Sequence, residues 1–468
     1  MSFRLGRSVA AVSRASLAPC LAVCERESRS QIRDRAAREG KLTTKGAAVQ
    51  DRGGIYYGWV VVGGAFTVMF LGFLVAYSFG AFFKALETEF AAERAEISFV
   101  FSFSIFLMFI VGAVAGPAAD RLGPRRVIAA GMVLIGVGLL AASRAQALWH
   151  LYLLYGLTIG LGVGFSYVPA VGTVQRWFLR RRGLASGIAV SGIGAGTLIG
   201  PFVATWLIGL MDWRGAYVTL AAVCVVLGLM GALVIEHSPE RRGLAPDGDP
   251  PPAPVGSGAG TADGAPFVVP GTDLKAALTS RPFLLYAAAT FLTSLGLFTP
   301  LVHLPNYARD HGLGDGAGVL LLGLFGFGSL AGRFLLGAIA DRFGRRPTLA
   351  ATFAIMGAMC VLWWASTAVW SLGIFAVVFG TCYGGYVALS PALMMDYFGG
   401  RNVSGIIGIL YSAAGIGALV GPTLSGLAFD LLQSYAIPIL AAAVFNLLAT
   451  AVMLATPTPG RWRAGHGL

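Results

Sequence analysis

The stretch "GPAADRLGPRR" (Gly116–Arg126) ends one long apolar segment of the chain, and a near copy, "GAIADRFGRR" (Gly337–Arg346), ends another. Their aspartates, Asp120 and Asp341, are 221 residues apart. A single offset kept over many positions predicts a tandem duplication of one unit in parallel orientation. The same offset of 221 relates Trp149 to Trp370, Gly164 to Gly385, Gly187 to Gly408, Gly194 to Gly415, Gly196 to Gly417, and Gly200-Pro201 to Gly421-Pro422.

The composition indicates a protein of the lipid bilayer. Of the 468 residues, 56% are hydrophobic and 12% are charged, whereas a soluble domain carries about 25% charged residues. Twelve apolar segments are long enough to cross a membrane as helices. We therefore predict an all-α membrane protein of twelve transmembrane helices in two six-helix repeats, near residues 57–83, 95–119, 127–144, 149–173, 184–210, 214–235, 282–308, 316–340, 348–366, 369–394, 403–429 and 435–456.

The positive charge is unevenly placed along the chain. The net charge is +12, and residues 1–50, with ten Lys or Arg and four Asp or Glu, carry half of it. Most other cations follow every second apolar segment. Because Lys and Arg accumulate in cytoplasmic loops, this pattern predicts that both termini are cytoplasmic. Nucleic-acid binding is the rival explanation of a basic chain, but no soluble domain is predicted to present the charges, so we expect no such partner.

Composition also predicts the domain boundaries. The Pro- and Gly-rich stretch "PDGDPPPAPVGSGAGTADGAP" (Pro246–Pro266) cannot build a core and marks a linker. The first 50 residues lack the apolar core of a secretory signal, and their four acids disfavour a mitochondrial transit peptide, so a flexible tail or a misplaced start codon fits better. We predict a disordered cytoplasmic tail at 1–52, six-helix bundles at 53–236 and 282–456, a cytoplasmic linker at 237–281 and a cytoplasmic tail at 457–468.

The two loops resemble the signature loop of the major facilitator superfamily, G-x-x-x-D-R-x-G-x-R-R. In that family the loop latches the two halves together through its aspartate, its basic residues and a neighbouring helix end. The simpler alternative is a short turn in which the aspartate caps a helix and the arginines fix topology. The resemblance implies a latch role for Gly116, Asp120, Arg121 and Arg125, and for Gly337, Asp341, Arg342 and Arg345.

Three further stretches resemble monocarboxylate porters of that superfamily, over about residues 53–456. They are "GGIYYGWVVVGGAF" (Gly53–Phe66), "WFLRRRGLASGIAVSGIG" (Trp177–Gly194) and "LVHLPNYARDHGL" (Leu301–Leu313). The last is similar to helix 7 of bacterial monocarboxylate and oxalate/formate-type porters. The resemblance implies a multi-pass transporter of a bacterial-type inner (cytoplasmic) membrane that works by alternating access.

The chain departs from those porters at three positions. Tyr77 stands where they often carry a lysine, and Ser329 where they often carry an acid. Ala414 stands where oxalate-type exchangers carry a second cation. A single fixed cation favours a monoanion over a dianion, and the groups usually associated with proton coupling are replaced.

Arg333 lies eight residues before Asp341, inside an apolar segment. A charge in the membrane core costs at least about 3 kcal/mol and usually marks a functional site. The predicted helices hold no Asp or Glu at mid-depth, since Glu236, Asp396 and Asp430 fall at helix ends. The expected partner is therefore a substrate carboxylate, held by two parallel hydrogen bonds, as the resemblance also implies. The alternative is an arginine that bonds helix carbonyls or extends toward the membrane surface.

Other polar residues are weaker candidates for the site. His303 lies between Pro300 and Pro305, which predict a bent helix; it either carries a coupled proton, binds the anion, or is a neutral side chain bonded to backbone. Asn306 is nearby, and Ser329 is one turn from Arg333 on the same face. We expect two or three of five tyrosines to line a central cavity: Tyr77, Tyr167, Tyr383, Tyr386 and Tyr411.

Other chemistries are disfavoured. The stretches "GIGAG" (Gly192–Gly196), "GFGSLAG" (Gly326–Gly332) and "GIGALVG" (Gly415–Gly421) mimic nucleotide-binding fingerprints, but no strand precedes them, so they predict close helix packing. Cys20 and Cys24 alone make a weak zinc motif. We expect no cofactor, no metal and no enzyme.

The predicted function is transport of a small organic monocarboxylate by a monomer, with a proton as the candidate coupled ion. Alternatives are the same fold serving dicarboxylate exchange, a drug or a sugar, and a non-transporting receptor or scaffold. A deep arginine without a deep acid disfavours a cationic substrate.

Overall fold

The computed structural model describes residues 56–178, 181–248, 272–399, 403–460 and 462, with Asp120, Arg182, Asp315, Val403 and Ser404 described only in their backbone. Residues Tyr56–Leu468 form one compact unit. The tail predicted at 1–52 and the middle of the predicted linker lie outside the described residues.

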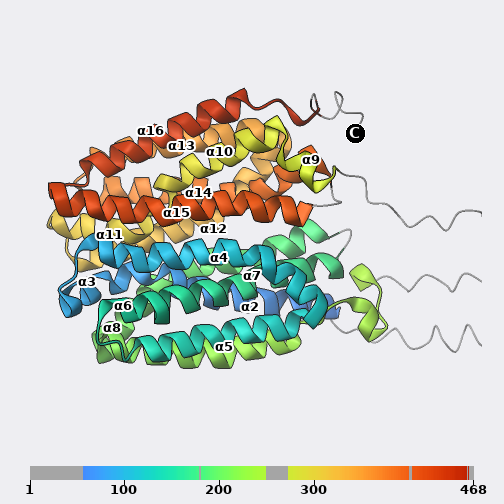
Figure 1. Cartoon of the computed structure of the whole chain (residues 1–468), viewed down its shortest axis with the longest axis horizontal. Helices are drawn as coiled ribbons and strands as arrows, with labels where there is room; N and C mark the ends of the chain where they lie inside the picture. The colour runs from blue at the N-terminus through green and yellow to red at the C-terminus, as the bar shows by residue number, and fades with distance from the viewer. Residues whose placement is uncertain (1–55, 179–180, 249–271, 400–402, 461, 463–468) are drawn as a thin grey trace, which may run out of the picture. The chain divides into compact units, whose positions relative to one another are not determined.

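Long apolar helices make up most of the described chain (Figure 1). Eleven of them are long and apolar enough to cross a membrane. One of these, α8, contains Met211 and Asp212 with non-helical backbone angles, so it is two helices joined at a sharp bend. Counted as two, α8 brings the described spans to the predicted twelve, and the fold class is confirmed.

The helices are α2 (Tyr57–Tyr77), α3 (Phe79–Phe90), α4 (Arg94–Leu122), α5 (Pro124–Ala142), α6 (Leu148–Leu151), a π-helical turn (Tyr152–Leu157), α7 (Thr158–Trp177), α8 (Arg182–Val234), α9 (Leu274–Leu278), α10 (Arg281–Leu297), α11 (Thr299–Asp310), α12 (Asp315–Phe343), α13 (Arg345–Trp364), α14 (Val369–Phe398), α15 (Val403–Leu432) and α16 (Ala436–Ala455).

The first span of each repeat is broken. Span one breaks at Ser78, between α2 and α3, and span seven breaks at Phe298, between α10 and α11. Pro300 explains the second break, because proline has no N–H to continue the helix. The first break has no proline, and it was not predicted. There the carbonyl of Val75, which an unbroken helix would use, accepts hydrogen bonds from Ser78 (3.0 Å) and from the Tyr155 hydroxyl (3.1 Å).

Glycines set the spacing of helices inside each half. A Cβ on Gly196 of α8 would lie 2.6 Å from the carbonyl oxygen of Phe70 on α2. Likewise, a Cβ on Gly417 of α15 would lie 2.8 Å from the carbonyl oxygen of Phe291 on α10. Small residues allow this approach of two backbones. The interpretation of the glycine-rich stretches as packing surfaces is confirmed.

The two halves meet mainly along α4 with α15 and along α8 with α12. We call the end of these helices that holds Arg94 and Asp310 the distal end, and the end that holds Asp120 and Asp341 the loop end. A Cβ on Gly426, near the distal end of α15, would lie 2.7 Å from the backbone of Ala95. Toward the loop end, a Cβ on Gly408 would first meet the Ala113 side chain, at 3.3 Å.

The second contact between the halves shows the same gradient. On α12, a Cβ on Gly326 would collide with the backbone of Leu198 on α8. Toward the loop end, a Cβ on Gly187 would meet only the tip of the Phe334 ring, at 3.9 Å. The halves are therefore packed more tightly toward the distal end than toward the loop end.

The glycine packing gives a direct test. We expect Gly196→Val to destabilise the protein by about 1–3 kcal/mol or more, because the added atoms meet backbone that cannot yield. Gly209→Val, on the same helix, is the matched control, because a Cβ there would meet nothing within 4 Å. Thermal unfolding followed by size-exclusion chromatography in detergent measures both. Equal melting temperatures for the two variants would contradict this account of the packing.

Candidate functional site

A small cavity lies between the halves, halfway along the helices. Phe73, Met108 and Ile193 are among its walls from the first half, and Phe298 and Val387 from the second. Its volume is about 30 Å³, which accommodates roughly one or two water molecules, so an organic anion requires the walls to move apart. The residues predicted for this place that line it are Tyr77, Tyr167, Tyr383, Tyr386 and Tyr411, together with Ala414. The expectation that two or three of the five tyrosines line a cavity was too low.

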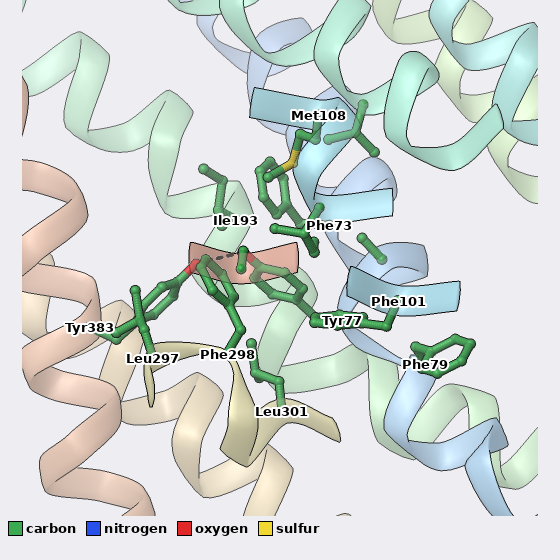
Figure 2. Packing of buried hydrophobic residues seen from close by; sticks show 14 of the residues in the cluster. Phe73, Tyr77, Phe79, Phe101, Met108, Ile193, Leu297, Phe298, Leu301 and Tyr383 are labelled. Atoms are coloured by element: carbon green, nitrogen blue, oxygen red, sulfur yellow. Dashed lines mark hydrogen bonds between the residues drawn. The ribbon is translucent and has the colours of Figure 1, made fainter. Parts of the chain in front are cut away.

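Tyr77 and Tyr383 join the halves across this cavity. Their hydroxyl oxygens are 2.6 Å apart, and Figure 2 shows the two side chains meeting from opposite sides. Neighbouring rings fix them: Phe73 packs edge-on against Tyr77 at 5.3 Å between centroids, and Phe298 against Tyr383 at 6.2 Å. The position expected to carry a lysine in related porters thus holds a neutral hydroxyl.

Arg333 lies on α12 beside this tyrosine cluster, with 8% of its surface exposed. Its Nη1 donates to the backbone carbonyl of Val190 on α8, in the other half. Its Nε and Nη2 are buried without a hydrogen-bond partner. The guanidinium interacts electrostatically with four hydroxyls, those of Tyr77, Tyr167, Tyr383 and Tyr411. One nitrogen thus bonds a helix carbonyl, as the alternative supposed, while the edge formed by Nε and Nη2 stays available.

Neither Arg333 nor the remaining candidates belong to the walls of this cavity. Ser329 is fully buried one turn from Arg333, and its hydroxyl has no partner. Asn306 is fully buried on α11, and neither its amide nitrogen nor its oxygen has a partner. His303, also on α11, bonds to residues at the distal end. The structure therefore brings Arg333 together with the tyrosines and places His303 in a different cluster.

The cluster around His303 includes Arg94, Asp310 and Asp430, and it joins the halves at the distal end. The sequence did not predict these contacts. Arg94 at the start of α4 forms a two-pronged ion pair with Asp310 at the end of α11, with N–O distances of 2.5 and 2.9 Å. Asp430 of α15 accepts hydrogen bonds from the backbone amides of Arg94 (3.1 Å) and Ala95 (2.8 Å). A carboxylate at a helix N-terminus is stabilised by the unpaired N–H groups and by the helix dipole. Two acids of the second half therefore hold the first helical turn of α4 in the first half.

The family model described as Major Facilitator Superfamily matches residues 65–332 and again residues 319–467. The chain belongs to the major facilitator superfamily. It is 29% identical to Monocarboxylate transporter 13 of Bos taurus over 403 residues, which cover 86% of this chain and 89% of that protein. It is 30% identical to Monocarboxylate transporter 11 of Homo sapiens over 405 residues, covering 83% and 80%. Monocarboxylate transporter 1 of Mus musculus is 28% identical over 414 residues, covering 84% and 83%. The resemblance to monocarboxylate porters is thus confirmed, and the chain is a multi-pass membrane protein.

The signature loops of this superfamily member make ion pairs within each half. Arg125 bonds Glu236 at 3.0 Å, just after α8. Arg345 pairs with Asp396 near the end of α14. The side chains of Arg121, Asp341 and Arg342 are exposed. The two loop glycines have open surroundings: a Cβ on Gly116 would meet only Val168, at 3.6 Å, and a Cβ on Gly337 would meet nothing within 4 Å. Asp120 is described only in its backbone. The latch between the halves stays a prediction for another conformation of this facilitator.

The distal ion pair gives a test of closure in this facilitator. We expect Asp310→Asn to raise the rate at which a thiol reagent modifies Ser102→Cys, because the neutral amide holds Arg94 less strongly. Ser102 suits the reporter because it is fully buried and its hydroxyl has no partner. It is one turn along α4 from Ser98, which contacts His303.

The background carries Cys20→Ser and Cys24→Ser, and the three native spanning cysteines are buried. Glu89→Gln is the matched control, because it removes the Glu89–Arg214 ion pair (2.8 Å), which joins two helices of the same half. If both variants change the labelling rate equally, the Arg94–Asp310 pair is not what closes this end.

Proposed function

We propose that this protein is a secondary active transporter that moves a small organic monocarboxylate, of the size of lactate or pyruvate, across a bacterial-type cytoplasmic membrane by alternating access. The observation that carries the proposal is the unpaired edge of Arg333, buried beside a cluster of tyrosine hydroxyls between the halves. The names of the relatives, which are monocarboxylate transporters, support the same substrate class.

The geometry of a guanidinium explains why this edge suits a carboxylate. Nε and Nη2 point their N–H bonds in the same direction, so one carboxylate can accept from both. Because Nη1 already bonds Val190, the side chain is fixed before the substrate arrives. Pre-ordering of this kind lowers the entropic cost of binding. The tyrosine hydroxyls supply further neutral donors around the anion.

The lining favours an anion with one charge. Tyr77 and Ala414 are neutral at the two positions where related porters carry cations, and both line the cavity. A dianion would leave its second carboxylate among tyrosine and phenylalanine rings without a counter-charge, which is unfavourable in a low-dielectric site. The apolar walls suit a short hydrocarbon substituent.

The two ends of the molecule support alternating access. The Arg94–Asp310 ion pair and the Asp430 helix cap hold the halves together at the distal end, whereas the loop end is packed less tightly. The positive loops support a cytoplasmic position for the loop end and both termini, so we propose that the distal end faces outward and that the structure corresponds to an outward-closed state. We further propose that the transporter acts as a monomer and that His303 carries a coupled proton.

The test is uptake of labelled lactate and pyruvate into proteoliposomes. We expect Arg333→Ala to abolish uptake and Arg333→Lys to lower kcat/KM roughly 10- to 100-fold, since loss of a charge-assisted hydrogen bond costs about 1.5–3 kcal/mol. Arg144→Lys, at an exposed position after α5, is the matched control and should transport normally. Full transport by Arg333→Lys would refute two-pronged binding, and equal uptake by Arg333→Ala would refute the site.

A further inference from the structure

His303 is fully buried at the distal end and contacts polar atoms on both sides of its ring. Its Nε2 lies 2.9 Å from the backbone carbonyl oxygen of Pro422 and 3.1 Å from the Ser98 hydroxyl. Its Nδ1 lies 3.1 Å from the Tyr435 hydroxyl. Tyr435 in turn lies 2.8 Å from Nη1 of Arg94, the arginine paired with Asp310. The imidazole thus contacts Pro422 of the second half and Ser98 of the first half through Nε2. Through Nδ1 and Tyr435 it is also linked to Arg94 of the first half.

The donor and acceptor groups set the direction of the hydrogen bonds that run from Arg94 through Tyr435 and His303 to Pro422. A carbonyl only accepts, so Nε2 carries the proton and donates to Pro422. The neutral ring then has its lone pair on Nδ1, which accepts from the Tyr435 O–H. Arg94 only donates, so it bonds the Tyr435 oxygen. Burial raises the pKa of Tyr435, in spite of Arg94 nearby, so its hydroxyl keeps its proton.

A second proton on His303 destabilises this arrangement. Nδ1–H would point at the Tyr435 oxygen, which already accepts from Arg94, and the Tyr435 proton would lose its acceptor. Two cations would then share one hydroxyl, and like charges at such separations repel strongly when they are poorly solvated.

The carboxylates around His303 are already bonded to Arg94 or to the start of α4. Asp310 is the carboxylate close enough to interact with His303, but both of its oxygens are bonded to Arg94. Glu87 bonds Nε of the same arginine at 3.3 Å, and Asp430 bonds the start of α4. From α3, the Phe83 ring faces His303 at 5.9 Å between centroids.

We propose that protonation of His303 opens the distal end. The neutral imidazole completes the chain from Arg94 through Tyr435 to Pro422, and the imidazolium breaks it and repels Arg94, so the halves separate there. An acidic medium on the distal side would thus favour the state that admits a proton and substrate together. Only this link to transport rests on the proposed function; the opening itself is independent of any substrate.

The test measures the distance across the distal end. Spin labels on Thr88→Cys of α3 and Leu432→Cys of α15, both exposed, report on the two halves in the Cys20→Ser, Cys24→Ser background. Pulsed electron paramagnetic resonance at pH 8 and pH 5, without substrate, should show a population of longer distances that increases several-fold at pH 5. His303→Gln should stay closed at both values, because its amide can donate to Pro422 and accept from Tyr435 but cannot take up a proton.

His311→Gln is the matched control. His311 is an exposed histidine just after α11 that contacts Tyr307, so its replacement should leave the pH response intact. Tyr435→Phe, which removes the middle of the chain, should favour longer distances at both pH values. An identical distance distribution of the unsubstituted His303 protein at the two pH values would overturn the proposal. A pH response retained in His303→Gln would also overturn it. Because no substrate is present, a protein that transports no carboxylate can still pass, so the two proposals fail separately.

Discussion

A permanently charged guanidinium inside an apolar bundle requires hydrogen-bond partners, and the meeting of the two halves depends on how Arg333 obtains them. The first partner is a main-chain oxygen of α8, so one nitrogen of an arginine in one half is bonded to the backbone of the other. This contact requires α8 and α12 to run close together, which the small residues along both helices permit. The unpaired edge of Arg333 is consequently presented at the interface between the halves.

The contacts inside each half differ in part from those that join the halves. Inside a half, glycines bring helix backbones close together. Between the halves, Gly326 and Gly426 also approach backbone closely, but other contacts are made by side chains, including the Tyr77–Tyr383 hydroxyls, Arg94 with Asp310, and Asp430 at the start of α4. Side-chain hydrogen bonds exchange with water at a modest net cost, whereas buried glycine contacts have no such substitute. Where side chains join the halves, the interface can therefore change its conformation while each half keeps its packing.

The sequence predicted the features that depend on length, composition and repetition. The duplicated loop, the twelve apolar segments and the lone arginine without a deep acid led to the fold and to the candidate site. It did not predict the Arg94–Asp310 pair, because the two residues are 216 positions apart and each sits at a helix end, where a charge is ordinary. Nor did it predict the break at Ser78, because the carbonyl freed there is satisfied by Tyr155, a residue distant in the sequence. The tyrosines were found as candidates, but their common cavity follows only from the packing of α2, α4, α7, α8, α14 and α15.

The paired breaks at Ser78 and Phe298 divide the first span of each half into a long body and a short distal segment. The bodies end at Tyr77 and Leu297, beside the cavity, whereas the distal segments α3 and α11 carry Glu87, His303 and Asp310 and contact each other. The backbone breaks thus separate the distal segments from the bodies that reach the cavity. This division keeps Glu87, His303 and Asp310, which hold the distal end together, apart from the tyrosines that line the cavity.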